Sequence, residues 1–356
     1  MTLREIAKVA GISIGTVDRV LHGRGRVSAA TKEKVEALIA ESGYKPNLVA
    51  RQLKLNRRYT FACLIPSLGE DSGYWRIAYN GVQKAARELA PFRVSMKKIE
   101  FNRYSEASFH ENVQQLFSAE FDGLLMAPLL PEASMSLLKR LPAGFPIVFF
   151  DAQLPGFSPL SRIGQNAFQS GTLAGRMLDA LATRKESYCV ISTHAEDFHI
   201  QKRVEGFLAY FAPIGTKKIN VFECFDMEHR EKREQFLGKL LRENPEIDGI
   251  FVTNASAHGV ASYVNGKAGR HIATVGYDLV PENEKLLRAG PLDVILSQRP
   301  EYQGYEGVYQ LYSHVVLQQE IEKEIIVPIV IFMKENLPPE TEARMEETNR
   351  AVTAEI

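Results

Sequence analysis

Residues 2–21 of the chain read TLREIAKVAGISIGTVDRVL, two short amphipathic stretches on either side of a glycine. Apolar residues recur at helical spacing before Gly11, where the first helix ends because a residue without a Cβ adopts the left-handed conformation at little cost. Ser13 can cap a second helix, in which Val17 and Val20 face the first one. This order of helix, tight turn and helix predicts a helix-turn-helix module, whose second helix would place its N-terminal end in the major groove of DNA.

The residues that follow extend this module into an all-α head. Ser28 can cap a third helix. Pro46 then disfavours the helical conformation at the residue before it, so a further short helix over residues 48–53 has to begin anew. We therefore predict a DNA-binding head over residues 1–46, followed by a short helix and polar linker over residues 47–58.

The charge of the chain is distributed unevenly. The 356 residues hold 43 Lys+Arg and 43 Asp+Glu, a net charge of zero. Residues 1–58 hold 12 basic and 5 acidic residues, which leaves 31 and 38 for the rest of the chain. The neutral total therefore combines a basic head with an acidic body, and a basic module of this kind is typical of proteins that bind nucleic acid.

Composition also excludes several classes of protein. A hydrophobic fraction of 45% argues against general disorder. The cysteines Cys63, Cys189 and Cys224 lie far apart, without the spacing of a zinc site or of a disulfide framework. The sequence starts without a secretion signal and has no apolar run of the roughly 18 residues that a membrane span needs. We therefore expect a cytoplasmic protein that holds no metal ion or other cofactor.

From residue 59 the sequence alternates between strands and amphipathic helices, which predicts parallel sheets with right-handed crossovers. More than eight strands indicate two sheets, and hence an α/β body of two lobes with a cleft between them. The body would span residues 59–338, ahead of an acidic tail over residues 339–356. We assign residues 59–160 and 299–324 to the N-lobe, and residues 161–298 and 325–338 to the C-lobe. The expected strands are 59–66, 93–101, 123–129, 146–152, 187–194, 218–225, 249–254, 271–278 and 293–298, and the expected helices are 75–89, 108–118, 168–183, 199–211, 229–243, 281–289 and 300–320.

The stretches TLREIAKVAGIS, GTV-RV, RVSAATKEKVEALIAESGYKPN and VARQL resemble the head of the LacI/GalR (lactose-repressor) family over residues 2–53. The resemblance implies that residues 48–53 form a hinge helix on operator DNA, next to the hinge helix of a dimer mate. It also implies that Leu53 wedges into a base step and opens the minor groove, an insertion that allows the bent duplex to contact more protein. The candidate DNA-binding residues are Thr2, Ser13, Ile14, Gly15, Thr16, Asp18, Arg19, His22, Arg26, Ser28, Asn47, Ala50, Leu53 and Lys54.

The second helix departs from the family in one position. Members commonly have TVSRV, whereas this chain has Asp18 within TVDRV. A carboxylate is repelled by phosphates but can accept a hydrogen bond from the amino group of cytosine, and Arg19 can donate two hydrogen bonds to guanine. We therefore expect an operator unlike those of better-known members.

The body is similar to ribose-type periplasmic binding proteins of type I, the effector domain that the family places after its hinge. In open α/β sheets, ligands bind beyond the carboxyl ends of the strands, so polar residues there are the candidates for effector binding. Trp75 could stack on the apolar face of a sugar ring, or it could be an ordinary core residue. Arg203 can hold hydroxyl or carboxylate oxygens with its planar fork of donors. The candidate effector-binding residues are Ser67, Tyr74, Trp75, Asp151, Gln153, Arg203, Asn254, Asp278 and Gln298.

Together these features predict a transcription regulator, most simply a repressor, rather than an enzyme. A homodimer would bind a near-palindromic operator, and a small molecule between the lobes would control the affinity for DNA. A sugar or polyol is the default effector, with a purine or a sugar acid as alternatives. Two other functions fit parts of the sequence: a transport-type sugar-binding protein, and an α/β enzyme with a regulatory head.

Overall fold

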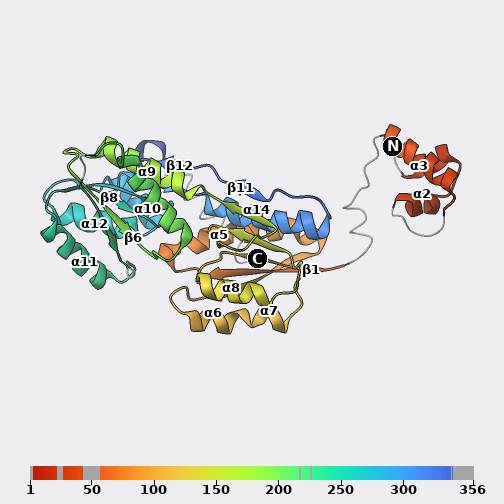
Figure 1. Ribbon diagram of the computed structural model, residues 1–356, viewed down its shortest axis with the longest axis horizontal. Coiled ribbons are helices and arrows are strands. Elements are labelled where there is room, and N and C mark those ends of the chain that lie inside the picture. The colour runs from red at the N-terminus through yellow and green to blue at the C-terminus, as the bar shows by residue number, and fades with distance from the viewer. Residues whose placement is uncertain are drawn as a thin grey trace. The chain divides into compact units, whose positions relative to one another are not determined.

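A computed structural model of the chain describes residues 3–21, 27–42, 57–215, 218–224, 227–337 and 339 (Figure 1). The chain divides into two compact units, Met1–Asn56 and Arg57–Ile356. The first unit contains the helical head, and the second contains the α/β body. The predicted hinge helix and most of the acidic tail lie outside the described residues.

The head consists of the three predicted helices, α1 (Leu3–Ala10), α2 (Ile14–Leu21) and α3 (Ala29–Ser42). Its core is small and fully buried around Ile6, Val17 and Val35, one residue from each helix. The turn between α1 and α2 follows the sequence prediction, because Gly11 has a φ of +71° and the Ser13 hydroxyl accepts a hydrogen bond from the N–H of Thr16 at 3.1 Å.

The first lobe of the body is built on a sheet of six parallel strands in the order β11-β5-β4-β3-β1-β2. Helices α5 and α14 cover one face, and α6, α7 and α8 cover the other (Figure 1). The strands are β1 (Tyr59–Pro66), β2 (Val94–Phe101), β3 (Gly123–Met126), β4 (Ile147–Phe150), β5 (Ser161–Gly164) and β11 (Glu324–Ile326). The helices are α5 (Tyr74–Leu89), α6 (Glu106–Val113), α7 (Gln115–Ser118), α8 (Pro131–Arg140) and α14 (Pro300–Leu311).

The second lobe repeats this arrangement with the order β12-β10-β9-β8-β6-β7, in which only β12 runs antiparallel to its neighbour. One apolar core lies between this sheet and α9 and α10, and another lies between the sheet and α11, α12 and α13. The strands are β6 (Ser187–Ser192), β7 (Lys218–Glu223), β8 (Ile247–Val252), β9 (Ala273–Tyr277), β10 (Val294–Ser297) and β12 (Val330–Phe332). The helices are α9 (Ala167–Leu181), α10 (Phe198–Phe211), α11 (Arg230–Glu243), α12 (Ala257–Lys267) and α13 (Pro281–Ala289).

The chain passes between the lobes three times, and two of these passages differ from the expected boundaries. We placed residue 161 in the C-lobe, but β5 pairs with β4 in the first sheet, so the passage comes after Gly164. We also placed residue 325 in the C-lobe, but β11 pairs with β5 and the passage comes after Ile326. The reason is physical: two short strands, β5 and the edge strand β11, complete the first sheet by backbone hydrogen bonds, which side-chain patterns do not reveal.

Several elements differ from those predicted. The short strands β5, β11 and β12 and the helices α8 and α12 lie outside every predicted range. Conversely, the predicted helix 108–118 is divided into α6 and α7, and the predicted helix 300–320 continues from α14 into a π-helical turn, Tyr312–Val316. Single-turn 3₁₀ segments occur at Asp71–Gly73, Ala90–Phe92 and Lys334–Asn336.

Each lobe contains one pair of helices that cross at very short distance over glycines. In the first lobe, a Cβ added to Gly304 of α14 would overlap the carbonyl oxygen of Ala78 in α5. In the second lobe, a Cβ added to Gly171 of α9 would overlap the carbonyl oxygen of Arg203 in α10. Backbone therefore lies directly against backbone, which holds the helices rigidly on their sheets.

The apolar residues of the body are used to fill these cores. Large side chains such as Phe61, Phe149 and Phe251 are fully buried. Over the ranges that the structure describes, no helix combines the length and the apolar character needed to cross a bilayer.

Candidate functional site

In the head, α2 exposes residues that the sequence analysis assigned to base recognition. Ile14 is 44% exposed, an unusual position for a large apolar residue. Gly15, Asp18 and Arg19 are exposed as well, and Thr16 is half-buried. The opposite side of the helix packs on the core of the head. Helix α2 thus presents a solvent-exposed face that includes its N-terminal end, as a recognition helix requires.

Of the remaining candidates in the head, only Ser28 lies within the described residues. Ser28 caps α3, where its hydroxyl accepts a hydrogen bond from the N–H of Thr31 at 3.3 Å. Seven candidates lie outside the described residues, and for them the assignment stays a prediction: Thr2, His22, Arg26, Asn47, Ala50, Leu53 and Lys54.

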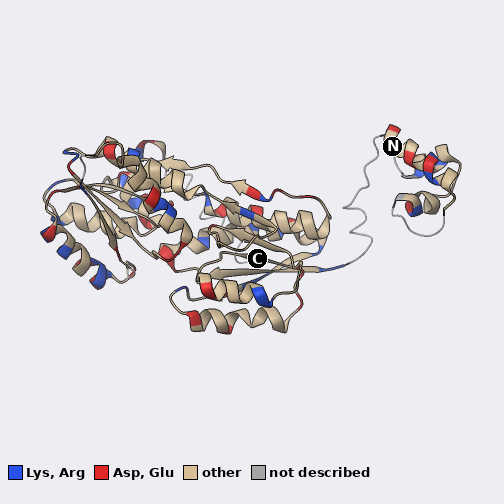
Figure 2. Cartoon of the chain, in the orientation of Figure 1, with Lys and Arg blue, Asp and Glu red and all other residues tan. Residues whose placement is uncertain are grey.

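The described helices of the head are charge-balanced. Residues 3–21 and 27–42 carry five Lys+Arg and five Asp+Glu, and Figure 2 shows both signs of charge on these helices. The excess of seven basic residues found by sequence therefore comes entirely from residues 22–26 and 43–58. The net positive charge of residues 1–58 thus lies in the stretches before and after α3.

In the body, polar side chains from both lobes converge at the carboxyl ends of the strands. They follow β1, β2 and β4 in the first lobe and β6, β8, β9 and β10 in the second. The cavity that they enclose has a volume of about 20 Å³, little more than a water molecule occupies. Its lining consists of Asp71, Tyr74, Trp75, Arg103, Asp151, His194, Asp197, His199, Ile200, Arg203, Asn254, Ala255, Asp278 and Gln298.

Arg203 occupies the second-lobe side of this cleft and is 2% exposed. Its Nη1 donates to the carbonyl oxygen of Thr253 at 2.7 Å, and its Nη2 donates to Oε1 of Gln298 at 3.0 Å. Its guanidinium lies 3.7 Å from the ring centroid of Tyr277, a cation–π contact. These contacts fix the plane of the guanidinium, which is the condition for directional hydrogen bonding to a ligand.

Asp278 is held by the same network. The backbone N–H and side-chain Nε2 of Gln298 donate to its two carboxylate oxygens at 3.1 and 3.0 Å. Burial raises the pKa of Asp278 to about 7, although the charge of Arg203 and both hydrogen bonds act in the opposite direction.

This raised pKa predicts an unusual dependence of stability on pH. Asp278 keeps its proton to about pH 7 when folded but loses it near pH 4 when unfolded. Between these values the folded chain binds more protons, so the free energy of unfolding falls as the pH rises. We expect Asp278→Asn to remove this contribution, so that the variant gains stability relative to the parent chain from pH 5 to pH 8. Urea unfolding at each pH measures the difference, and parallel curves for the two proteins would contradict it.

In the first lobe, Trp75 packs against Tyr74 and orients Asp71. Its ring is 1% exposed and packs at right angles to Tyr74, with 4.9 Å between ring centroids. Its Nε1 donates to Oδ2 of Asp71 at 2.7 Å. The indole is therefore a buried side chain that borders the cavity and orients the Asp71 carboxylate. Tyr74 similarly donates from its hydroxyl to Oδ1 of Asp151 at 2.6 Å.

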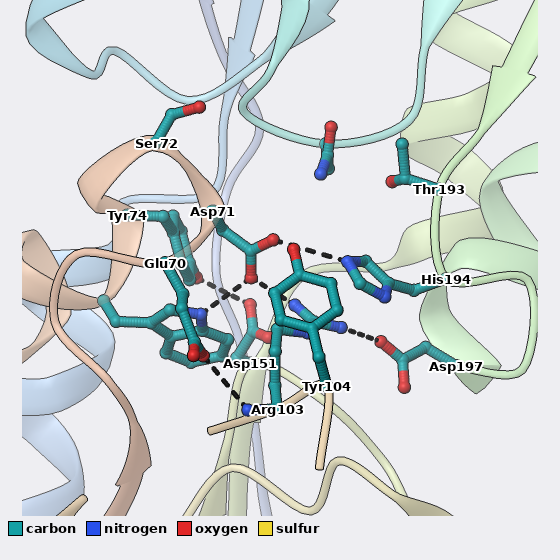
Figure 3. Close-up of polar contacts among 12 residues, drawn as sticks. Glu70, Asp71, Ser72, Tyr74, Arg103, Tyr104, Asp151, Thr193, His194 and Asp197 are labelled. Carbon is teal, nitrogen blue, oxygen red and sulfur yellow. Dashed lines mark hydrogen bonds and ion pairs between the residues drawn. The ribbon is translucent and has the colours of Figure 1, made fainter. Parts of the chain in front are cut away.

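A second charged cluster crosses the cleft from one lobe to the other (Figure 3). The Arg103 guanidinium pairs through Nη1 with Oδ2 of Asp71 in its own lobe, and through Nη2 with Oδ2 of Asp197 in the other lobe at 2.6 Å. His194 also faces Asp71, with 3.6 Å between Nε2 and Oδ1. Burial opposes ionisation of Asp71, but the charge of Arg103 and the contact with His194 hold its pKa well below the ordinary value. Burial raises the pKa of Asp197 to about 6, against the charge of Arg103.

The structure brings together most of the predicted effector-binding residues. Ser67 and Gln153 do not line the cavity, and the Ser67 hydroxyl donates instead to the carbonyl oxygen of Phe101 at 3.2 Å. The other seven do line it: Tyr74, Trp75, Asp151, Arg203, Asn254, Asp278 and Gln298.

The prediction missed the charged cluster around Arg103. The rule that ligands bind beyond strand ends would have found Arg103, which comes two residues after β2, and Asp71, which follows β1 by five residues. His194 and His199, which are absent from the predicted effector-binding residues, also line the cavity.

Comparisons with known proteins agree with both halves of this description. Residues 2–47 match the bacterial regulatory proteins of the lacI family, and residues 61–319 match the periplasmic binding protein domain. The chain is 27% identical over 284 residues to the ribose operon repressor of Escherichia coli (strain K12), a match that covers 78% of this chain and 82% of that protein. It is 24% identical over 299 residues to the HTH-type transcriptional regulator MalR of Streptococcus pneumoniae serotype 4, a match that covers 83% of this chain and 88% of that protein.

Solved structures share the fold of the body. A LacI transcriptional regulator from Bacteroides fragilis aligns with a TM-score of 0.72 and 26% identity, covering 79% of this chain and 98% of that one. The glucose-galactose binding protein GanP of Geobacillus stearothermophilus aligns with a TM-score of 0.69 and 21% identity, covering 80% and 100%. With a lacI-type helix-turn-helix head joined to a two-lobed periplasmic binding protein domain, the chain belongs to the LacI family of bacterial transcription regulators.

Proposed function

We propose that this chain is a cytoplasmic repressor that binds a near-palindromic operator as a homodimer and is controlled by a sugar or polyol in the cleft between its lobes. The observation that carries the proposal is the convergence of buried polar side chains from seven strand ends on one cavity, in a chain with a DNA-binding head. The name of the E. coli relative, a ribose operon repressor, supports a sugar as the effector class.

Recognition of the operator is assigned to the exposed face of α2 and to the hinge. Arg19 donates to guanine, Asp18 accepts from cytosine and Ile14 contacts a thymine methyl group. Leu53 enters the minor groove, where an apolar wedge kinks the duplex. The basic residues before and after α3 contact phosphates, which supply affinity without sequence preference.

Control by the effector follows from the geometry of the cleft. A cavity of about 20 Å³ is far smaller than the roughly 300 Å³ or more of pockets that bind small ligands, so the lobes have to separate before a sugar can enter. Two arrangements of the lobes therefore exist, and a ligand that binds them unequally shifts their populations. The lobe angle is transmitted to the linker at Arg57, where β1 begins two residues later.

Binding of the intact chain to DNA tests this function directly. Sequences selected from random DNA should be near-palindromic, and a panel of neutral sugars added to the complex should contain one that changes the affinity at least tenfold. Arg19→Ala should weaken binding to the selected DNA about tenfold or more, because a bidentate contact to guanine contributes about 1–3 kcal/mol. Lys267→Ala on α12 of the body is the matched control and should have no effect. Equal binding by the two variants would contradict the role of the head.

A further inference from the structure

The guanidinium of Arg103 is already neutralised within the protein. It lies between Asp71, which follows β1 in the first lobe, and Asp197, which precedes α10 in the second (Figure 3). The three side chains are at most 7% exposed, so solvent screens these ion pairs very little. When both carboxylates are ionised, the cluster carries a net negative charge, which repels an anionic ligand.

The cavity as a whole has no excess of positive charge. Four carboxyl groups line it, those of Asp71, Asp151, Asp197 and Asp278, against the guanidiniums of Arg103 and Arg203 and two histidines. Burial raises the pKa of Asp197 to about 6 and that of Asp278 to about 7, so both are ionised above pH 7. Burial and the neighbouring arginines lower the pKa of His199 well below its ordinary value, so this imidazole is neutral. His194 adds positive charge when it is protonated, because Asp71 and Glu196 raise its pKa against the effect of burial.

The unused hydrogen-bonding atoms of the cleft fit hydroxyl groups. Within the described part of the chain, Nε of Arg203 and Nδ1 of His199 are buried without a hydrogen-bond partner, and Oδ1 of Asp71 has only its ion-pair contact with Nε2 of His194 at 3.6 Å. One of these atoms accepts, one donates, and the imidazole nitrogen does either according to its tautomer. A hydroxyl both donates and accepts, whereas a phosphate dianion or carboxylate only accepts and would face the Asp71 oxygen with like charge.

We propose that Arg103, held between Asp71 and Asp197, makes the cleft selective for an uncharged polyhydroxylated effector over phosphorylated and acidic sugars. This inference rests on the proposed function, in which the effector binds in the cleft. Specificity of this kind arises from repulsion of the wrong ligand as much as from attraction of the right one. The three residues set the charge balance of the cavity, and Oδ1 of Asp71, Nε of Arg203 and Nδ1 of His199 bind the hydroxyls.

Two substitutions should change this selectivity in opposite directions. Asp197→Asn removes one carboxylate with little change of shape and frees part of the Arg103 charge, so anionic sugars should gain affinity. The Asp197 side chain makes no hydrogen bond to the N-terminus of α10, so the helix does not lose a cap. Arg103→Gln removes the cation and leaves two carboxylates together, so anionic sugars should bind even more weakly than to the parent chain.

Titration calorimetry on the full-length chain provides the test. The probes are neutral pentoses and hexoses, together with ribose 5-phosphate, glucose 6-phosphate and glucuronate. The parent chain should bind at least one neutral sugar and bind its charged counterpart at least 100-fold more weakly. Asp197→Asn should reduce this ratio at least tenfold, Asp197→Glu should largely restore it, and Arg103→Gln should increase it.

A matched control and a folding check complete the experiment. Asp122 pairs with Arg57 at 2.7 Å outside the cleft, so Asp122→Asn removes a carboxylate from an ion pair without changing the ratio. Thermal unfolding shows whether each variant is folded. If Asp197→Asn does not fold, the ratio measured for Arg103→Gln still tests the inference. Tighter binding of a charged sugar by the parent chain would overturn the inference and leave the proposed function intact. Absence of binding by every sugar, neutral or charged, would contradict both.

Discussion

Gly304→Ala will lower the free energy of unfolding of the body by about 3 kcal/mol or more. The added Cβ would overlap the carbonyl oxygen of Ala78, and a Cβ at Gly81 would overlap the carbonyl oxygen of Glu301 in the same crossing. These neighbours are backbone atoms of α5 and α14, so no side chain can rotate to make room. The helices must separate, which opens space in the core that both of them cover.

The control for this prediction is Gly266→Ala in α12. A Cβ at Gly266 has no atom within 4 Å, and its helix belongs to the same body. Gly266→Ala should leave the free energy of unfolding unchanged or raise it by up to about 1 kcal/mol, because alanine loses less conformational freedom than glycine when it enters a helix. Urea unfolding of the two variants measures the contrast. A Gly304→Ala protein as stable as Gly266→Ala would show that the helix crossing tolerates a methyl group.

Arg203→Met is expected to lower both the stability of the body and its affinity for the effector. Methionine keeps part of the apolar stem but removes the hydrogen bonds to Thr253 and Gln298 and the contact with Tyr277. Breaking a buried charge network by removing one partner costs about 3–5 kcal/mol. We expect a comparable loss of stability, since Asp278 then keeps only its contacts with Gln298. We also expect at least a 100-fold loss of affinity for the effector.

Operator binding separates this local effect from general damage to the protein. The head has its own core, so Arg203→Met should bind the selected DNA as tightly as the parent chain does, without a response to sugar. Arg176→Met, at an exposed arginine of α9, is the matched control and should retain both affinity for the effector and response. A normal effector response in Arg203→Met would contradict the assignment of Arg203 to the binding site.

The predictable part of the fold is the part with strong periodicity. Strand β1 and helix α13 were predicted to the residue, because a long buried run and a proline-to-glycine segment have clear ends. Helix α12 was missed because its sequence, AHGVASYVNGK, has two glycines and little separation of polar and apolar faces. Strands β11 and β12 were missed because three residues are too few to show alternation, and β5 was missed because its sequence, SRIG, has a single large apolar residue.

The same contrast holds for the candidate site. Asp151, Asp278 and Gln298 lie at the carboxyl ends of the predicted strands and directly follow β4, β9 and β10, so their convergence follows from parallel topology alone. The role of Trp75 could not be assigned in this way. A tryptophan after a strand can face a ligand or the core, and only packing against Tyr74 and Phe150 places it in the core.

The sequence by itself determined the helix-turn-helix head, the alternation of strands and helices, and the strand ends at which the cleft residues lie. These features depend on local periodicity and on chain order, which the amino-acid sequence displays directly. The pairing of Arg103 with Asp197 was decided only by the tertiary structure, because the two residues are 94 positions apart and belong to different lobes. A charge becomes neutralised only when the closed fold brings its partner within hydrogen-bonding distance and excludes water from both.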